Sequence, residues 1–386
     1  MSRYLLVALA GALAGLCTAP ASAALDGGGS YLMQGFYNTL GVLPPTAGPY
    51  RAAGSGAGKK ALLINDSQAL TPGSSVPFSV DYAISESRLT VNELAEYRSN
   101  HQVPGAVAGS AADWGPLIQV PVAITSVAIP YRVRLASGQP LTDLDLNGGM
   151  LCGLFSGAIT TWDEINPAYS RTPIKVIYRA DRAGTSEILT RHLNSLCPQA
   201  FNIGNLFVSA HRGPLPGHWQ AVSSDQALLA GVAANEGAIG YSGPAALDIT
   251  SNAQVARING LLPPSAISQV DLAQFTPPAT ASDRADPHKW APDIANPAYG
   301  YAMVGYSYLI FGQCYRDLRD VTAMRSLLMR HFGPNPQINT DAQLNAQHLI
   351  PVDALWKKAV RDNFLLTTNP LSLNYPSVCN GIGRPL

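Results

Sequence analysis

Short segments of the chain carry apolar residues in runs or at every second position. The clearest are 174–178, 238–241 and the long stretch 117–133, in which Ile118, Val120 and Val122 alternate with other residues. A period of two is typical of β-strands, because successive side chains point to opposite faces of the sheet. We predict strands at these segments and at 302–311. The stretch 117–133 is long enough to run between two lobes, and 302–311 is placed to return the chain.

Amphipathic segments of helical length lie between these strands. Thr90 and Glu93 have the spacing of a capping box, and Asp353 is placed to cap a final helix that ends near Leu366. These residues offer side-chain oxygens to the free backbone N–H groups of a first helical turn. The alternation of both kinds of segment predicts an α/β fold.

The first 23 residues have the pattern of a secretory signal peptide. Arg3 precedes an apolar stretch, 4–16, and the small residues 21–23 follow it. The apolar stretch is shorter than the roughly 20 residues of a membrane helix. Cys17 follows Leu16, where a lipoprotein signal requires a small residue. We therefore expect a periplasmic or extracellular protein without a membrane anchor.

Length and charge narrow the class of protein further. A mature chain of about 360 residues exceeds one ordinary hydrophobic core, which favours two lobes. The sequence has 25 Lys and Arg against 25 Asp and Glu. Binding of nucleic acid requires clustered basic residues, so we expect no nucleic-acid partner.

Four cysteines follow the predicted cleavage site. An even number in an exported chain favours two disulfides. Three pairings are possible, and we favour the local one, Cys152 with Cys197 and Cys314 with Cys379. Reduced core cysteines are the alternative. No Cys-x-x-Cys or His-x-His spacing suggests zinc, so we expect no metal.

The strand 174–178, the loop 179–185 and the helix after it form the best candidate for a binding site. A helix start presents unpaired N–H groups and the positive end of a dipole, and Gly184 lets a ligand approach the backbone. Arg179, which we place on the loop, offers a fork of donors that suits a phosphate. An ordinary turn with a surface arginine would have the same pattern.

Two glycine-rich segments, 27–32 and 54–58, could face that helix start. The second precedes a predicted short strand at 61–64. Glycines in such places are also common turn formers, so these segments alone identify no ligand.

A set of motifs, taken in chain order, resembles one protein family. The motifs are Gly27-Gly28-Gly29, Gly54-Ser55-Gly56, Ser85-Glu86-Ser87-Arg88-Leu89-Thr90, Leu117-Ile118-Gln119-Val120-Pro121, Tyr178-Arg179-Ala180, Leu151-Cys152-Gly153 and Cys379-Asn380-Gly381. The chain resembles the DING-type phosphate-binding proteins, which are similar to the phosphate-capturing subunit of bacterial ABC importers. The resemblance covers nearly the whole mature chain.

The resemblance implies a periplasmic-binding-protein-like (type II) fold, with two α/β lobes, two hinge strands and a ligand cleft between the lobes. We place lobe I at 24–128 and 306–386 and lobe II at 129–305. The resemblance also implies the local cysteine pairing. We expect a monomer without a cofactor, and an ABC importer membrane subunit is a candidate partner. The implied ligand is HPO₄²⁻, and its implied binding residues are Tyr31, Leu32, Ser55, Glu86, Arg179, Gly184 and Thr185.

Several positions depart from the family pattern. Tyr31 stands in place of threonine, Glu86 of aspartate and Ala183 of serine, and Arg182 replaces a small residue and could add a contact. A carboxylate accepts the proton of HPO₄²⁻ and repels sulfate, and Glu86 keeps that charge on a longer side chain. Two ligands therefore stay open, phosphate itself and a related anion such as a phosphate ester, phosphonate or arsenate.

A secreted phosphomonoesterase of the alkaline phosphatase kind is the alternative function, because some relatives of DING proteins have been assigned that activity. The sequence contains no His-Glu-x-x-His or Gly-x-Ser-x-Gly motif. His211 and His218 come closest to a catalytic grouping, and we interpret them as loop residues. We therefore assign no catalytic residue and favour a binding protein.

Overall fold

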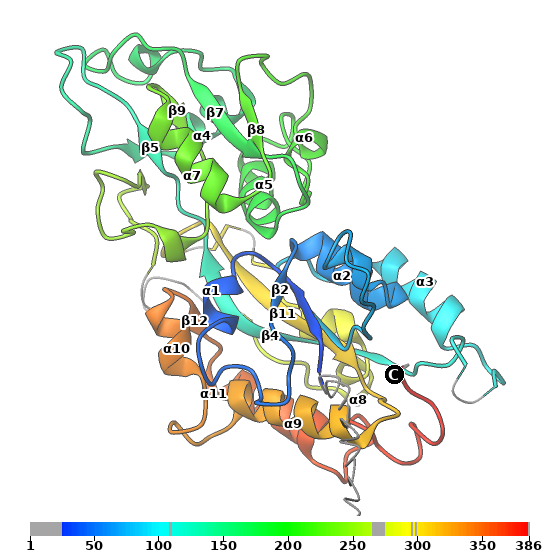
Figure 1. Cartoon of the computed structure of the whole chain (residues 1–386). Coiled ribbons are helices and arrows are strands. Elements are labelled where there is room, and N and C mark those ends of the chain that lie inside the picture. The colour runs from blue at the N-terminus through cyan, green and yellow to red at the C-terminus, as the bar shows by residue number, and fades with distance from the viewer. Residues whose placement is uncertain (1–24, 108–109, 265–274, 295, 298, 385–386) are drawn as a thin grey trace, which may run out of the picture.

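The computed structural model describes residues 25–107, 110–264, 275–294, 296–297 and 299–384, so the predicted signal peptide lies outside the described residues. Figure 1 shows two α/β units, one above the other, joined by a few extended segments. We call the lower unit, built on a six-stranded sheet, lobe I, and the upper unit, built on a four-stranded sheet, lobe II.

The sheet of lobe I has mixed directions. Its strands, in spatial order, are β12 (Ile350–Pro351), β4 (Leu117–Ser126), β11 (Val304–Gly312), β3 (Tyr82–Ser85), β1 (Gly27–Gly29) and β2 (Arg51–Ala52). β1 runs parallel to β2 and β3, whereas β11 is antiparallel to both β3 and β4. All ten residues of β4 are buried, because helices and loops cover both faces of this sheet.

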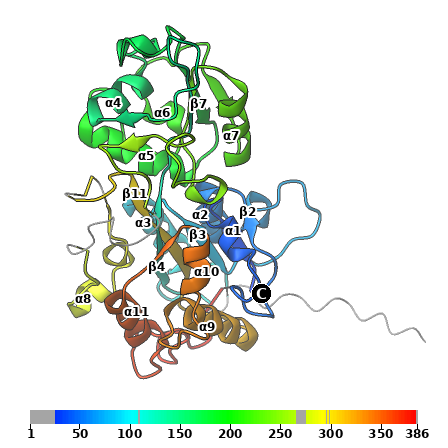
Figure 2. The same cartoon turned by 90° about the vertical axis from the view of Figure 1, so that its left-hand side faces the viewer.

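The helices of lobe I lie around its sheet (Figure 1). They are α1 (Gln34–Tyr37), α2 (Ser55–Ile64), α3 (Val91–His101), α9 (Leu318–Phe332), α10 (Asp341–Ala346) and α11 (Ala354–Val360), with a π-helical turn, Arg361–Leu365, after the last. In Figures 1 and 2, α1 and α2 lie next to lobe II and α9 and α11 lie at the far end. The predicted caps are confirmed: Thr90 and Glu93 form a capping box, and Asp353 accepts from the N–H of Trp356.

Lobe II has the strand order β5 (Tyr131–Arg132), β9 (Ala238–Ile239), β7 (Lys175–Arg179), β8 (Gln220–Val222). Its helices are α4 (Gly148–Ser156), α5 (Gly184–Leu196), α6 (Phe207–Ala210) and α7 (Asp225–Ala234), and a separate strand pair joins β6 (Asp145–Leu146) to β10 (Arg257–Ile258). Both expected disulfides are present. Cys152–Cys197 joins α4 to the end of α5, and Cys314–Cys379 lies in lobe I.

Two adjacent chain segments connect the lobes. Beyond β4, the N–H of Val127 donates to the carbonyl of Met303, just before β11, at 2.9 Å. The hydroxyl of Tyr301 donates to the carbonyl of Val127 at 2.8 Å. The predicted strands 117–133 and 302–311 therefore run side by side between the lobes, as expected from their length. The first of them is divided into β4 and β5.

The predicted strand at 61–64 is wrong. These residues form the end of α2, and the glycine-rich segment is its first turn. Glycine lowers helix propensity, but Gly58 lies against the backbone of β1, where a Cβ atom would come within 2.7 Å of the Cα of Gly29. Packing of Gly58 against β1 therefore stabilises the helix despite the low helix propensity of its glycines.

The Pro-, Ala- and Asp-rich composition of about 261–298 predicts a long surface excursion, but the described segment 275–294 is partly buried. It contains α8 (Ala281–Arg284) and the 3₁₀ turn Pro287–Trp290, and Trp290 is buried. The ring of Trp290 packs against Trp356 and Phe364 of lobe I. This part of the range 129–305 thus lies on the surface of lobe I.

Candidate anion site at the lobe junction

Two helix starts, one from each lobe, meet at the junction. Ser55 is the first residue of α2 in lobe I, and Gly184 is the first residue of α5 in lobe II. Gly54 precedes α2 with a φ of 97°, a conformation that favours glycine. The N–H groups of a first helical turn have no partner within the helix, and the dipole adds positive potential there. The junction therefore favours negative charge.

Glu86 places its carboxylate between these helix starts. It follows β3 and is only 1% exposed. Three serine hydroxyls donate to it, from Ser30 at 2.6 Å, Ser55 at 2.6 Å and Ser307 at 2.8 Å. Both carboxylate oxygens are therefore held by residues of lobe I.

The same carboxylate contacts lobe II directly. A Cβ atom on Gly184 would lie 2.0 Å from Oε2 of Glu86, so only glycine leaves room at this position. Burial raises the pKa of Glu86 above its ordinary value, and the three hydroxyl donors oppose the rise. The extra methylene of glutamate thus brings the chain's own carboxylate to the start of α5.

Arg179 faces the same space from the end of β7. Arg179 is the last residue of β7 and is 1% exposed, so the expectation that it lies on a loop is wrong. Its Nε and Nη2 donate to the two oxygens of Asp181 at 2.7 and 2.5 Å, and its Nη1 donates to Asp225. These contacts lock the guanidinium in one orientation and neutralise its charge. The burial of Asp225 raises its pKa, and Arg179 opposes that rise.

Thr185 offers an unused donor at this place. It is the second residue of α5 and is 2% exposed, and its hydroxyl has no hydrogen-bond partner in the described part of the chain. A buried hydroxyl without a partner costs about 1–3 kcal/mol. A ligand oxygen at this position would remove that cost.

One small cavity joins these groups. The predicted residues Tyr31, Leu32, Glu86, Arg179, Gly184 and Thr185 all line it, together with Gly54, Ala183 and Asp225. Its volume is about 10 Å³, room for about one water molecule. A tetrahedral oxyanion is larger, so its entry requires Glu86 to turn aside or the lobes to move apart.

The lobes are closed over this cavity. A Cβ atom on Gly243 in lobe II would lie 2.0 Å from the side chain of Leu32. The hydroxyl of Ser87 donates to Glu187 of α5 across the junction. Close packing of this kind leaves room for little water and strengthens the polar contacts inside.

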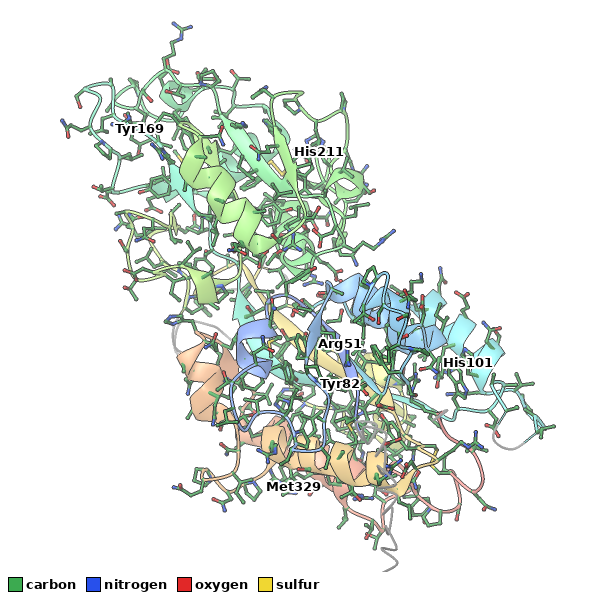
Figure 3. The ribbon with its side chains drawn as sticks, viewed as in Figure 1. Arg51, Tyr82, His101, Tyr169, His211 and Met329 are labelled. Atoms are coloured by element: carbon green, nitrogen blue, oxygen red, sulfur yellow. A yellow bond between two sulfur atoms is a disulfide. The ribbon has the colours of Figure 1, made fainter. Side chains whose placement is uncertain are left out.

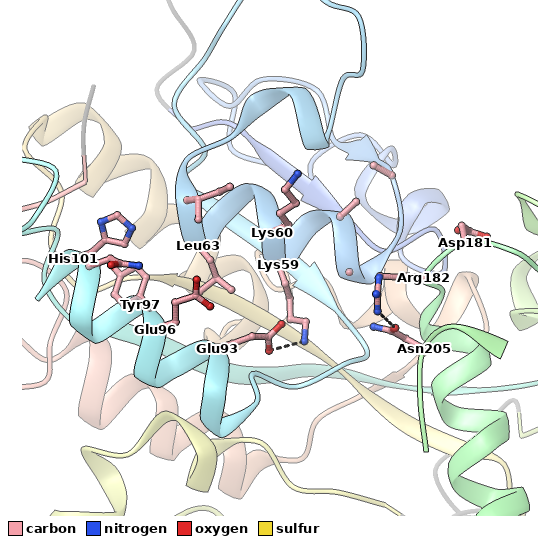
Figure 4. Close-up of a pocket in the computed structure, with 15 residues that line it drawn as sticks. Lys59, Lys60, Leu63, Glu93, Glu96, Tyr97, His101, Asp181, Arg182 and Asn205 are labelled. Atoms are coloured by element: carbon pink, nitrogen blue, oxygen red, sulfur yellow. Dashed lines mark hydrogen bonds and ion pairs between the residues drawn. The ribbon is translucent and has the colours of Figure 1, made fainter. Parts of the chain in front are cut away.

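Ser55 and Arg182, the remaining predicted residues, do not line the small cavity. Ser55 lies behind Glu86 and donates to it. Arg182 lines a separate groove beside α2 and α3, where its Nη1 donates to Asn205 at 3.3 Å (Figure 4). Arg182 contacts Gly56 across the lobe junction, so it takes part in closure.

Four residues of the site were missed in the sequence. Ser30 and Ser307 support Glu86 from positions far apart in the chain, and Asp181 and Asp225 orient Arg179. Asp181 had a local signal, because it lies two residues after the arginine. Ser30 lies within the glycine-rich segment 27–32, which was predicted to face the helix start. Ser307 and Asp225 had no local signal, because their positions depend on how β11 and α7 meet the site.

The histidines that suggested catalysis lie elsewhere. His211 contacts the carbonyls of Gly213 and Ser156, and His218 contacts that of Ile174, all within lobe II. Figure 3 shows His211 in the upper unit. Among the described residues, no group of three or more His, Cys, Asp or Glu could hold a metal ion. A helix long and apolar enough to span a membrane is likewise missing from the described segments.

Comparison with known proteins agrees with this architecture. A family model described as the PBP superfamily domain matches residues 38–323. A solved structure, a high affinity periplasmic phosphate-binding protein (PfluDING) bound with phosphate, is 35% identical; the match covers 94% of this chain and 99% of that one, with a TM-score of 0.84. This chain belongs to the DING group of the PBP superfamily.

Two other proteins similar to this chain have names that differ in kind. The phosphate-binding protein from Stenotrophomonas maltophilia is 32% identical, with a TM-score of 0.84 and coverage of 94% of this chain and 99% of that one. Alkaline phosphatase L from Pseudomonas aeruginosa is 38% identical, and the match covers 100% of both chains. The proteins similar to this chain therefore include some named for binding and some named for catalysis.

Proposed function

We propose that this protein is an exported solute-binding protein that captures inorganic phosphate, or a closely related phosphorylated anion, between its lobes. The observation that carries the proposal is the unpartnered hydroxyl of Thr185 at the start of α5, in a cavity that also contains Arg179 and Glu86. Relatives that cover the whole mature chain are named for phosphate binding.

Dipoles rather than net charge would hold the anion. Arg179 is already paired with two aspartates, so the cluster of Arg179, Asp181, Asp225 and Glu86 has no excess of positive charge. The starts of α2 and α5, the Thr185 hydroxyl and the guanidinium are hydrogen-bond donors fixed in a dry site. Affinity should therefore depend weakly on salt.

Glu86 would select for a protonated anion. A carboxylate accepts the hydrogen of HPO₄²⁻, whereas sulfate has no hydrogen to donate and is repelled. In this structure the serine hydroxyls occupy part of the carboxylate, so the ligand would compete with Ser55 for Oε2.

Ligand entry would require a movement of the lobes, which we delimit as 24–128 with 306–386 and 129–305, except that the segment 275–294 moves with lobe I, on which it packs. The paired segments around Val127 and Met303 are the natural hinge, because they are the hydrogen-bonded connection between the sheets. We further propose a periplasmic or extracellular location, which the predicted signal peptide supports, and delivery to an ABC importer membrane subunit.

Isothermal titration calorimetry with phosphate and sulfate tests the proposal. We expect heat with phosphate and none with sulfate, and Glu86→Gln should admit sulfate because it removes the repelling charge. No heat with phosphate or any phosphate ester, from protein shown by circular dichroism to be folded, would overturn it.

Phosphomonoester hydrolysis is the second candidate function, because relatives 36–38% identical over the full chain are named alkaline phosphatase L. Such activity would rely on Arg179, Ser55 and the start of α5 to stabilise an expanding phosphoryl group. Turnover of a chromogenic phosphate ester by homogeneous protein, lowered roughly two- to tenfold in Thr185→Val, would support it. Turnover that persists unchanged in that variant would assign the activity to a contaminant.

A further inference from the structure

A second, larger cavity adjoins the small one at the lobe junction. Its volume is about 720 Å³, within the range of small-molecule sites. Tyr31, Leu32 and Asp225 line both cavities. The larger cavity extends from there between α1 of lobe I and the start of α7 in lobe II, so these three side chains lie between the two cavities.

The lining of the larger cavity suits uncharged hydroxyl groups. Its side chains include the amides of Gln34, Asn38, Gln226 and Gln347. An amide both donates and accepts hydrogen bonds, as a hydroxyl does. Asp225 is the single charged residue among the described lining residues, so a second anionic group on the ligand would find no cation there.

A buried hydroxyl in this cavity lacks a partner. Ser242 lines the cavity and is 0% exposed, and its Oγ has no hydrogen-bond partner in the described part of the chain. Its backbone N–H and carbonyl are both bonded to Ala128, so only the side chain is free. Thr185 and Ser242 thus offer one unused hydroxyl in each of the two adjoining cavities.

We propose that the preferred ligand is a phosphate monoester of a small polyhydroxyl compound, of the size of glycerol phosphate or a hexose phosphate. The inference rests on the proposed function. The phosphoryl group lies at Thr185 and Arg179, and the ester oxygen points past Tyr31 and Asp225. The hydroxylated part lies among the amides and Ser242, where Asp225 accepts a hydrogen bond from one of its hydroxyls.

Calorimetry on the mature protein tests the inference with four probes: inorganic phosphate, glycerol 3-phosphate, glucose 6-phosphate and free glucose. We expect at least one ester to bind roughly tenfold more tightly than phosphate, a difference of about 1.4 kcal/mol. Free glucose should give no heat. Phosphate that binds as tightly as both esters, or more tightly, would overturn the inference and leave the proposed function intact. No binding of any phosphorylated probe would overturn both.

Variants at the larger cavity give an independent readout. Ser242→Ala and Gln226→Ala should each weaken the ester roughly three- to tenfold and leave the affinity for inorganic phosphate unchanged. Gln226 is exposed, so its replacement should not disturb folding. Gln199→Ala, an exposed residue of lobe II that lines neither cavity, is the control and should change neither affinity. Equal weakening of both ligands by Ser242→Ala would show a general effect on the cleft and refute this placement.

Discussion

Thr185 and Thr190 lie on the same helix and are both buried, but only Thr190 has its hydroxyl satisfied. Oγ1 of Thr190 donates to the carbonyl of Gly204 at 2.9 Å and accepts from the N–H of Gly204 at 3.1 Å. Thr185 has no such partner and faces the cavity at the lobe junction. We therefore assign a structural role to Thr190 and a binding role to Thr185.

The first prediction follows from this difference. Thr185→Val should raise the unfolding free energy of the ligand-free protein by up to about 1–3 kcal/mol, because it removes a buried hydroxyl without a partner. The same change should weaken phosphate binding by roughly 0.5–1.5 kcal/mol, because the ligand loses a donor. Thr190→Val is the matched control, and we expect the reverse, lower stability with unchanged affinity. Chemical denaturation and calorimetry measure both quantities, and a destabilised Thr185→Val would mean that its hydroxyl has a structural partner.

The second prediction concerns the length of the acidic side chain in the cavity. Glu86→Asp removes one methylene and should withdraw the carboxylate from Gly184, which enlarges a cavity of about 10 Å³. We expect phosphate affinity to rise roughly tenfold, about 1.4 kcal/mol. Glu96→Asp, on the exposed side of α3, controls for the substitution and should have no effect. Unchanged or weaker binding in Glu86→Asp would show that the longer side chain does not compete with the ligand.

The third prediction concerns Arg179. Arg179→Ala should abolish phosphate binding and also lower stability by about 3–5 kcal/mol, because Asp181 and Asp225 lose the charge that pairs them. Adding Asp225→Asn should recover part of the stability without recovering binding. Arg182→Ala is the control, and its exposed side chain should contribute less than about 0.5 kcal/mol to stability. Full stability of Arg179→Ala in denaturation experiments would contradict the ion pairs seen here.

The fourth prediction concerns pH. Asp81 in lobe I is 4% exposed and accepts from the N–H of Asp26, and burial raises its pKa to about 8. A raised pKa of an acid means that the folded state binds more protons than the unfolded state. The contribution of Asp81 to the free energy of unfolding is fully present below about pH 4. As the pH rises from about 4 to about 8, the free energy of unfolding falls by up to about 1.4 kcal/mol per pH unit.

Asp81→Asn should remove this pH dependence. We expect the variant to melt at a higher temperature than the natural protein at pH 8, and the difference should shrink towards pH 5. Asp66→Asn, at a partly exposed cap, is the control for the substitution. Parallel melting curves of Asp81→Asn and the natural protein across this range would contradict a raised pKa.

Local patterns in the sequence were sufficient for several features. The capping box of Thr90 and Glu93 and the N-cap Asp353 involve residues within four positions of each other, so they do not depend on the rest of the fold. The two long connecting strands were predictable because an apolar period of two extends over many residues. The helix start at Gly184 followed from the turn before it, whereas α2 was mistaken for a strand because its glycines are poor helix formers.

The serine cage around Glu86 was decided only by the tertiary structure. Ser30, Ser55 and Ser307 come from β1, α2 and β11, and no spacing in the sequence brings these elements together. The partners of Arg179 and the second cavity with Ser242 are likewise set by how the two lobes meet. The sequence by itself determined which residues could bind an anion, because caps, turns and side-chain chemistry are local. The fold determined which donors are already occupied, because hydrogen bonding depends on distances across the junction.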